Sequence, residues 1–161
     1  MLVRRARSDD LETIVDFNAR LAEESEGISL DRGRLRDGVA KLLGDESLGL
    51  YLIAEADGAP VGQLGLTYEW SDWRNGLFWW VQSVYVVSER RREGILSGLY
   101  GRVLDLAPTH GVCGVRLYVD RRNRVAKAAY NRLGLAPTEY EMLETDFVLE
   151  RASTPEPEAM A

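Results

Sequence analysis

Three arginines and a glycine stand where a long apolar segment meets a predicted helix. Residues 77–87 are apolar and aromatic, as in a strand at the centre of a sheet, and the basic run 90–92 follows closely. Gly94 comes next, at the predicted start of the helix. The first N–H groups of a helix have no intrahelical acceptor and carry positive potential, so they can bind phosphate. The segment predicts a pyrophosphate site, although a plain turn with solvated arginines would have the same sequence.

A second set of chemically useful residues belongs to a later helix. Asn123 is a good N-cap, and Gly134 is a typical residue at a helix end. Tyr130 follows the cap by seven residues, so the two lie on the same face of the helix. The single histidine and the single cysteine, His110 and Cys113, form no soft metal cluster, and we predict no metal site.

The elements that must position these residues follow from hydrophobic periodicity and turn signals. Strands are predicted at residues 2–7, 50–56, 61–70, 77–87 and 115–119, with one or two closing strands within 140–149. Helices are predicted at about 8–25, 31–43, 94–107 and 123–133, the first capped by Ser8 and the second by Asp31. Asp57-Gly58 and Asn75-Gly76 are hairpin signals. This order predicts a mixed α/β sheet with helices packed on it.

Length and charge limit the classes of function. A chain of 161 residues suits one domain, which we place at residues 1–150, followed by a polar, Pro-rich and disordered tail at 151–161. The net charge of −6 argues against nucleic-acid binding, and no apolar run is long enough to span a membrane. The N-terminus becomes acidic where a signal peptide would be apolar, so we expect a cytoplasmic protein.

The two motifs together resemble those of the GNAT superfamily of N-acetyltransferases. The family's acetyl-CoA motif, Arg/Gln-x-x-Gly-x-Gly/Ala, is similar to Arg91-x-x-Gly94-x-Leu96, in which the last small residue is missing. The second motif matches at Asn123, Ala126, Tyr130 and the run 133–135. The resemblance covers residues 3 to about 149. It implies an α/β (α+β) fold with a mixed, mostly antiparallel sheet of six to seven strands and flanking helices, and acetyl-CoA as cosubstrate.

The resemblance also implies roles for individual residues. A bulge near Gln82-Ser83-Val84 would free the backbone N–H of Val84 to act as the oxyanion donor, and the same strand would pair with the pantetheine arm. Tyr130 would be the general acid for the CoA thiolate, unless it is a half-buried core tyrosine. The residues expected to bind acetyl-CoA are Val84, Tyr85, Val86, Arg91, Arg92, Glu93, Gly94, Ile95, Leu96, Ser97, Asn123 and Tyr130. For Asn123, the capping role alone would also explain the residue.

The general base is harder to assign. The aromatic run around Glu69 and the Trp79-Trp80-Val81-Gln82 segment are loosely similar to the spermidine/spermine acetyltransferase branch. That branch carries a Glu-Asp pair where this chain has Gln82-Ser83, and a glutamine is not a base. Glu69 or an ordered water is the candidate base, and Glu24, Glu26 and Glu144 are lesser candidates. A solvated surface charge is the more common explanation for each of these glutamates.

These residues favour an N-acetyltransferase that moves acetyl from acetyl-CoA to a primary amine of a small molecule by direct attack. Two alternatives remain open: acetylation of a protein or peptide, and a noncatalytic CoA-binding sensor. Trp70, Trp73, Trp79 and Trp80 are interpreted as core or dimer contacts, one or two of which could line the acceptor pocket. Members of the family often form dimers, and these tryptophans together with that tendency predict a homodimer.

Overall fold

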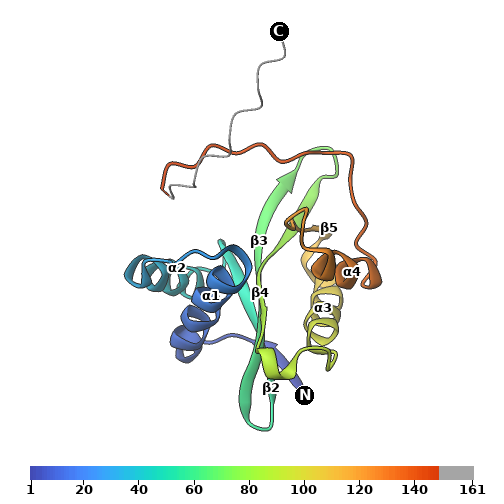
Figure 1. Ribbon diagram of the computed structural model, residues 1–161. Coiled ribbons are helices and arrows are strands. Elements are labelled where there is room, and N and C mark those ends of the chain that lie inside the picture. The colour runs from blue at the N-terminus through green and yellow to red at the C-terminus, as the bar shows by residue number, and fades with distance from the viewer. Residues whose placement is uncertain (149–161) are drawn as a thin grey trace.

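The computed structural model of the chain describes residues 1–148, so the predicted tail at 151–161 lies outside the described residues (Figure 1). Its elements are β1 (Leu2–Arg5), α1 (Leu11–Glu26), α2 (Arg32–Gly44), β2 (Gly49–Ala56), β3 (Ala59–Ser71), β4 (Gly76–Val86), α3 (Ile95–Leu106), β5 (Val112–Arg116) and α4 (Arg124–Arg132). Their order is the predicted one up to α4. No described helix is long and apolar enough to cross a membrane.

The described strands form one sheet in the order β1-β2-β3-β4-β5. Neighbours are antiparallel except for β4 and β5, which are parallel. The sheet therefore has five strands in residues 1–148, and the expected count of six to seven is wrong. The difference lies in the predicted closing strands, because residues 140–148 have no regular structure.

Within the described residues, the segment 140–148 joins no strand of the sheet, and its large apolar side chains are exposed. It runs past the tip of the β3–β4 hairpin instead of along β5 (Figure 1). Leu143 is 93% exposed and Phe147 is 91% exposed. A strand is stabilised by a partner edge and by burying one face, and these residues have neither.

Two helical layers cover the two faces of the sheet: α1 and α2 lie on one face, and α3 and α4 on the other (Figure 1). Alternation along β2 shows the division, since Leu50 and Leu52 pack toward α3 while Tyr51 and Ile53 pack toward α1 and α2. A fully buried leucine or isoleucine contributes about 1.5–3 kcal/mol to stability. These two cores hold β3 and β4 rigidly at the centre.

Local signals set most of the element boundaries. The carboxylate of Asp31 accepts a hydrogen bond from the N–H of Arg34 at 2.7 Å, which confirms the predicted cap of α2. Asp57 and Gly58 adopt φ values of 54° and 78°, as a tight hairpin turn requires. Ser8 is not the cap of α1, however. It begins a 3₁₀ turn, in which the Asp10 carboxylate accepts the N–H of Arg7 at 2.7 Å.

The predicted strand at 115–119 is displaced, since β5 begins three residues earlier and ends at Arg116. Gly114 lies inside β5, and a Cβ atom there would come within 2.2 Å of the Phe78 ring. The glycine is therefore a packing requirement of the strand and not a sign of a loop.

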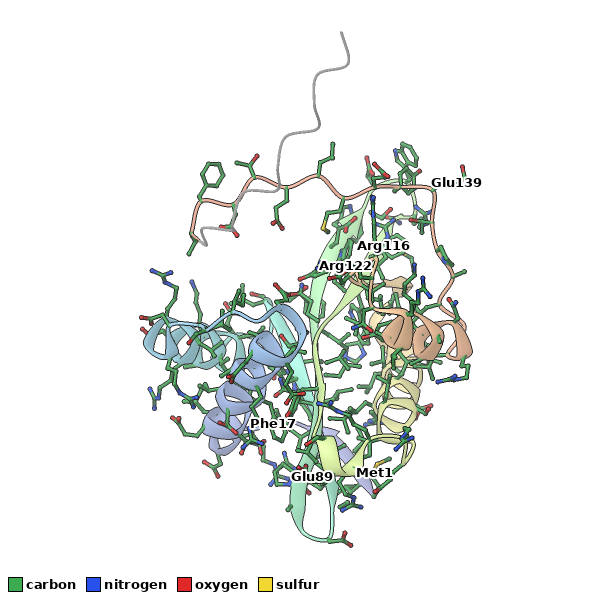
Figure 2. All side chains as sticks on the ribbon, viewed as in Figure 1. Met1, Phe17, Glu89, Arg116, Arg122 and Glu139 are labelled. Atoms are coloured by element: carbon green, nitrogen blue, oxygen red, sulfur yellow. The ribbon has the colours of Figure 1, made fainter. Side chains whose placement is uncertain are left out.

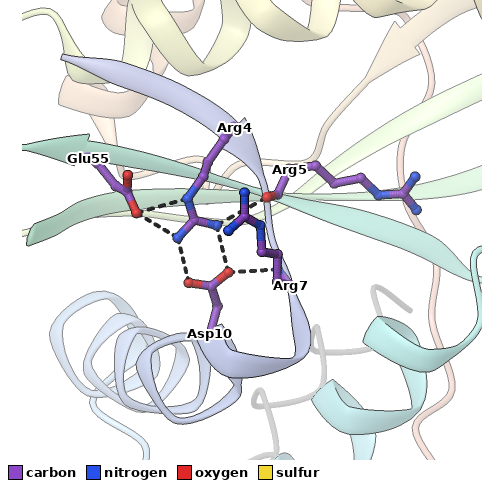
Figure 3. A network of polar contacts seen from close by, with 5 residues as sticks. All are labelled: Arg4, Arg5, Arg7, Asp10 and Glu55. Atoms are coloured by element: carbon purple, nitrogen blue, oxygen red, sulfur yellow. Dashed lines mark hydrogen bonds and ion pairs between the residues drawn. The ribbon is translucent and has the colours of Figure 1, made fainter.

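An ion network fixes the start of α1 to the sheet (Figure 3). The guanidinium of Arg4 donates to both carboxylate oxygens of Asp10, at 2.7 and 2.8 Å, and to Glu55. Asp10 is only 7% exposed. Hydrogen bonding by Arg4 holds the pKa of the Asp10 carboxyl below its ordinary value. The network joins β1, β2 and the start of α1.

Candidate active site

The centre of the site is a bulge in β4. Gln63 of β3 pairs with Tyr85, and Gly65 pairs with Gln82, so two steps on β3 match three steps on β4. Ser83, within the extra stretch, has a φ of 50°. The bulge is thus found at the predicted place. Neither Ser83 nor Val84 has a ladder partner on β3, which leaves their backbone groups available for other bonds.

The edge of β4 is open on its other side. The parallel pairing of β4 with β5 ends at Trp80 and Arg116, whereas β4 continues to Val86. Within the described residues, the stretch from Val81 onward has no strand partner on the β5 side. Val84 and Val86 pack toward the α3 core. An extended chain could therefore add to this edge as a further strand.

The turn after β4 presents a row of free N–H groups. Arg92 and Gly94 have φ values of 69° and 82°, and the N–H of Gly98 is the first to bond back into the helix, to Gly94 O at 3.0 Å. In residues 1–148, no backbone acceptor is found for the N–H groups from Arg92 to Ser97. No heavy atom would lie within 4 Å of a Cβ at Gly94. The space and the donors both suit an anionic group.

The three arginines of this turn, Arg90, Arg91 and Arg92, differ in their hydrogen-bond and ion-pair partners. Arg91 bonds to Glu24 of α1 and donates to Val86 O at 3.0 Å. Arg90 pairs with Glu93 and Asp57. Within the described chain, the guanidinium of Arg92 has no acidic or carbonyl partner. Of the three guanidinium groups, that of Arg92 is therefore the one available to an anion at this turn, beside the backbone N–H groups.

Glu24, a lesser candidate for the general base, is held by two partners, Arg91 and Tyr85. One of its oxygens accepts from the Tyr85 hydroxyl at 2.8 Å and the other pairs with Arg91. Hydrogen bonding by Arg91 keeps the pKa of Glu24 below its ordinary value, which makes it a weak base. The ring of Tyr85 packs against Phe17, with 5.2 Å between the ring centroids, so its side chain is turned to the α1 side and its backbone is left for the open edge.

α4 carries the predicted acid. The side-chain oxygen of Asn123 accepts the N–H of Ala126 at 2.9 Å, which confirms the cap. Tyr130 is half-buried, and burial raises the pKa of its hydroxyl, so the proton is held at neutral pH. Leu133 and Leu135 attach this end of the chain to the α3 core.

Glu69 is not beside the bulge. It pairs with Phe78, four positions along β3 from Gly65, so it lies roughly 14 Å away at the usual rise per residue. One carboxylate oxygen accepts at 2.9 Å from Arg116, whose place is labelled in Figure 2, and the other accepts from the Trp80 indole. Direct proton transfer needs a hydrogen bond, so Glu69 can act at the bulge only through water.

The remaining predicted residues are exposed or packed. Glu26 is exposed on the last turn of α1, and Glu144 is exposed in the irregular segment. Trp79 is core, whereas Trp70 and Trp73 are 61% and 86% exposed at the hairpin. Within residues 1–148, no three His, Cys, Asp or Glu side chains gather as metal ligands would.

Sequence reasoning missed a buried amide network beneath the bulge. Gln63 is 0% exposed, and its Nε2 donates to the side-chain oxygen of Asn18 at 2.7 Å and to Ser83 O at 3.2 Å. The available signal was a lone glutamine within the run 60–66, whose other residues are apolar or glycine.

Comparisons with known proteins point to one family. Residues 13–135 match the model of the acetyltransferase (GNAT) family. Over 129 residues the chain is 34% identical to a mycothiol acetyltransferase of Clavibacter michiganensis subsp. michiganensis (strain NCPPB 382), a match that covers 78% of this chain and 39% of the relative's length. A possible acetyltransferase from Clostridium difficile 630 has a crystal structure that superimposes with a TM-score of 0.84 and 44% identity, over 92% of this chain and 98% of that one. The fold is also that of a predicted acetyltransferase with acetyl-CoA from Clostridium acetobutylicum, with a TM-score of 0.74, 20% identity and coverage of 90% and 95%.

Proposed function

The chain belongs to the acetyltransferase (GNAT) family, and on that premise we propose that it transfers acetyl from acetyl-CoA to a primary amine of a small molecule by direct attack. The observation that carries the proposal is the open, bulged edge of β4, which runs directly into the N–H-rich turn at Gly94. A ligand with an amide-bearing arm and a pyrophosphate fits both parts. The name of the mycothiol acetyltransferase relative supports acetyl transfer as the reaction.

The residues of this chain divide the binding task. The backbone of Val84, Tyr85 and Val86 would pair with the pantetheine arm. The turn residues Arg91, Arg92, Glu93, Gly94, Ile95, Leu96 and Ser97 would surround the pyrophosphate, chiefly through backbone N–H groups and the Arg92 guanidinium. The side-chain N–H₂ of Asn123 is left for the same arm, since its oxygen is used as the cap.

Bound acetyl-CoA would supply an electrophilic thioester carbonyl. As the amine nitrogen attacks it, the Val84 N–H would donate to the carbonyl oxygen, where negative charge grows. When the carbon–sulfur bond breaks, Tyr130 O–H would protonate the sulfur. An alkyl ammonium has a pKa of roughly 10, so a proton must first leave it, and water between the amine and Glu69 would carry that proton.

The polar strip on the α1 side of β3 and β4 supports an amine acceptor. Thr67 accepts a hydrogen bond from Gln82 Nε2 at 2.7 Å, and the half-exposed Glu69 and Trp80 follow along the strands. A carboxylate and an aromatic wall beside hydrogen-bonding groups suit a cationic amine. We also propose that the protein works in the cytoplasm and pairs as a homodimer, for which the exposed Trp70 and Trp73 offer apolar contact.

A thiol-release screen tests the proposal. The protein is mixed with acetyl-CoA and with polyamines, amino acids, aminoglycosides or peptides, and free CoA thiol is measured. We expect release with a free small amine. Release with peptides alone would instead assign a protein or peptide acetyltransferase. Tight acetyl-CoA binding without release in any mixture would identify a CoA-binding sensor and overturn the enzymatic proposal.

A further inference from the structure

The buried amide of Gln63 contacts the bulge directly. Gln63 lies on β3 at the point where the register with β4 shifts, and its Nε2 reaches the carbonyl of Ser83. Its Oε1 is buried and, in the described part of the chain, has no hydrogen-bond partner. A buried amide with an unpaired oxygen is less stable than an apolar side chain of the same size. Packing alone therefore does not account for a glutamine here.

Residues of two other elements, α1 and β2, hold this amide in place. Asn18 of α1 accepts from Gln63, and its own Nδ2 donates to the Tyr51 hydroxyl of β2 at 3.1 Å. The Tyr51 hydroxyl lies 3.5 Å from Ser83 Oγ. Gly65 gives the Tyr51 ring room, since a Cβ there would lie in tight contact, 3.0 Å from the ring and 3.2 Å from Gln82 O. Contacts from α1, β2 and β3 thus converge on Ser83.

The Ser83 carbonyl also determines which way the amide points. A carbonyl oxygen only accepts hydrogen bonds, so the group that faces it must be the N–H₂ of Gln63. With the amide reversed, two oxygens would meet at this distance and repel each other. Asn18 supports the same orientation, because its oxygen accepts from Gln63 while its N–H₂ is used by Tyr51.

This bond sets the direction of a neighbouring donor. The C=O of Ser83 and the N–H of Val84 belong to one peptide group, and no described peptide is cis. In a trans peptide these two groups point in opposite directions. Because the carbonyl is held by Gln63, the Val84 N–H points away from Gln63 and β3. It has no ladder partner on β3, and β5 ends its pairing before this point.

We propose that Gln63, held by Asn18, is a positioning residue that locks the Ser83–Val84 peptide with its N–H aimed at the acetyl carbonyl. The inference rests on the proposed function and adds the device that pre-orients its oxyanion donor. Without the Gln63 bond, the peptide could rotate and present its carbonyl to the substrate, because neither Ser83 nor Val84 has a ladder partner on β3 that would hold the peptide group.

The test compares the wild type with Gln63→Met, which keeps the length of the side chain but cannot donate to Ser83 O. Val39→Ala is the matched control, because it removes buried contacts under the same face of the sheet without touching the bulge. The probe is acetyl-CoA with a ¹³C-labelled carbonyl. Its affinity is measured by calorimetry, and the carbonyl stretch of the bound form is measured by isotope-edited infrared spectroscopy.

We expect the wild type to lower the carbonyl stretch on binding, and Gln63→Met to bind with similar affinity but lose that shift. With any acceptor found in the screen, kcat should fall by roughly 10²–10³-fold, the loss typical of one oxyanion donor, while KM for acetyl-CoA changes less. Val39→Ala should lose stability and keep the shift. Asn18→Ala serves as a second variant if Gln63→Met does not fold, and it should weaken the same shift.

A Gln63→Met protein that keeps both the carbonyl shift and kcat would overturn this inference and leave the proposed function intact. An equal loss in Val39→Ala would also overturn it, by showing a general effect of stability. A wild type that does not bind acetyl-CoA would overturn the proposed function itself, and this inference with it.

Discussion

Replacing Gly94 by aspartate is expected to weaken acetyl-CoA binding severely while the fold persists. Gly94 is the N-cap of α3, with a φ of 82° and open space where a side chain would begin. An aspartate there would suffer strain of roughly 1–2 kcal/mol from the left-handed conformation. Its carboxylate could accept the free N–H groups of Leu96 and Ser97 and so recover part of that cost.

The matched variant is Gly94→Asn, which has the same shape and the same left-handed strain but no charge. The difference between the two isolates the repulsion between a carboxylate and the pyrophosphate. Two charges 4 Å apart interact by about 4 kcal/mol at an effective dielectric constant of 20, and the exposure of this turn reduces that to about 2–4 kcal/mol. At about 1.4 kcal/mol for each factor of ten, Asp should bind about 30- to 10³-fold more weakly than Asn.

Calorimetry with acetyl-CoA measures both dissociation constants, and thermal unfolding checks that both variants fold. The Asp-to-Asn ratio should shrink at high salt, because the Debye length falls from about 10 Å at 0.1 M to about 3 Å at 1 M. Equal affinity of the two folded variants at low salt would refute the placement of the pyrophosphate at this turn.

Three further predictions follow from the same structure. Tyr130→Phe keeps the ring and should lower kcat by about 10²–10⁴-fold with a smaller change in KM; a steady-state comparison that finds kcat unchanged would make Tyr130 a packing residue. Asp10→Asn should cost about 1.5–3 kcal/mol near neutral pH, because Arg4 loses its charge-assisted hydrogen bonds to Asp10 and keeps only those to Glu55. The pKa of Asp10 is lowered in the folded protein, so its contribution to stability is present above the ordinary aspartate pKa near 4 and is lost as the pH falls through the lower, folded pKa. The free energies of unfolding of the wild type and Asp10→Asn, measured by urea denaturation, should therefore converge in acid. A difference that stays constant with pH would contradict this. Light scattering at micromolar concentration should give a dimer mass, and a monomer mass would contradict the proposed homodimer.

Features that depend on a few adjacent residues were predictable from the sequence. The caps at Asp31 and Asn123 and the hairpin turn at Asp57-Gly58 are examples, because each uses a side chain or a φ value available within about three residues. The place of the bulge in β4 was expected only through the family resemblance, since no local residue marks it.

Features that depend on distant partners were not predictable. The strand predicted at 115–119 begins earlier, at Val112, because the ring of Phe78 occupies the space of the side chain that Gly114 lacks and the glycine fits inside β5. Arg91 was expected to face a phosphate, yet Glu24, 67 positions away, takes its guanidinium. Gln63 likewise finds its acceptor Asn18 at a separation of 45 positions. In each case the fold decides which distant residue comes into contact.

The open edge of β4 also bears on how the protein behaves when concentrated. A row of unpaired N–H and C=O groups on a strand edge is a template for a strand of another molecule, and such pairing leads to aggregation. In the described chain this row runs from Val81 to Val86, and the bulge at Ser83 interrupts it, which shortens the stretch available for pairing. A CoA arm laid along the same edge would cover it. Bound CoA would then protect the edge from pairing with other molecules. Purified protein stored with CoA should therefore aggregate more slowly than protein stored without it.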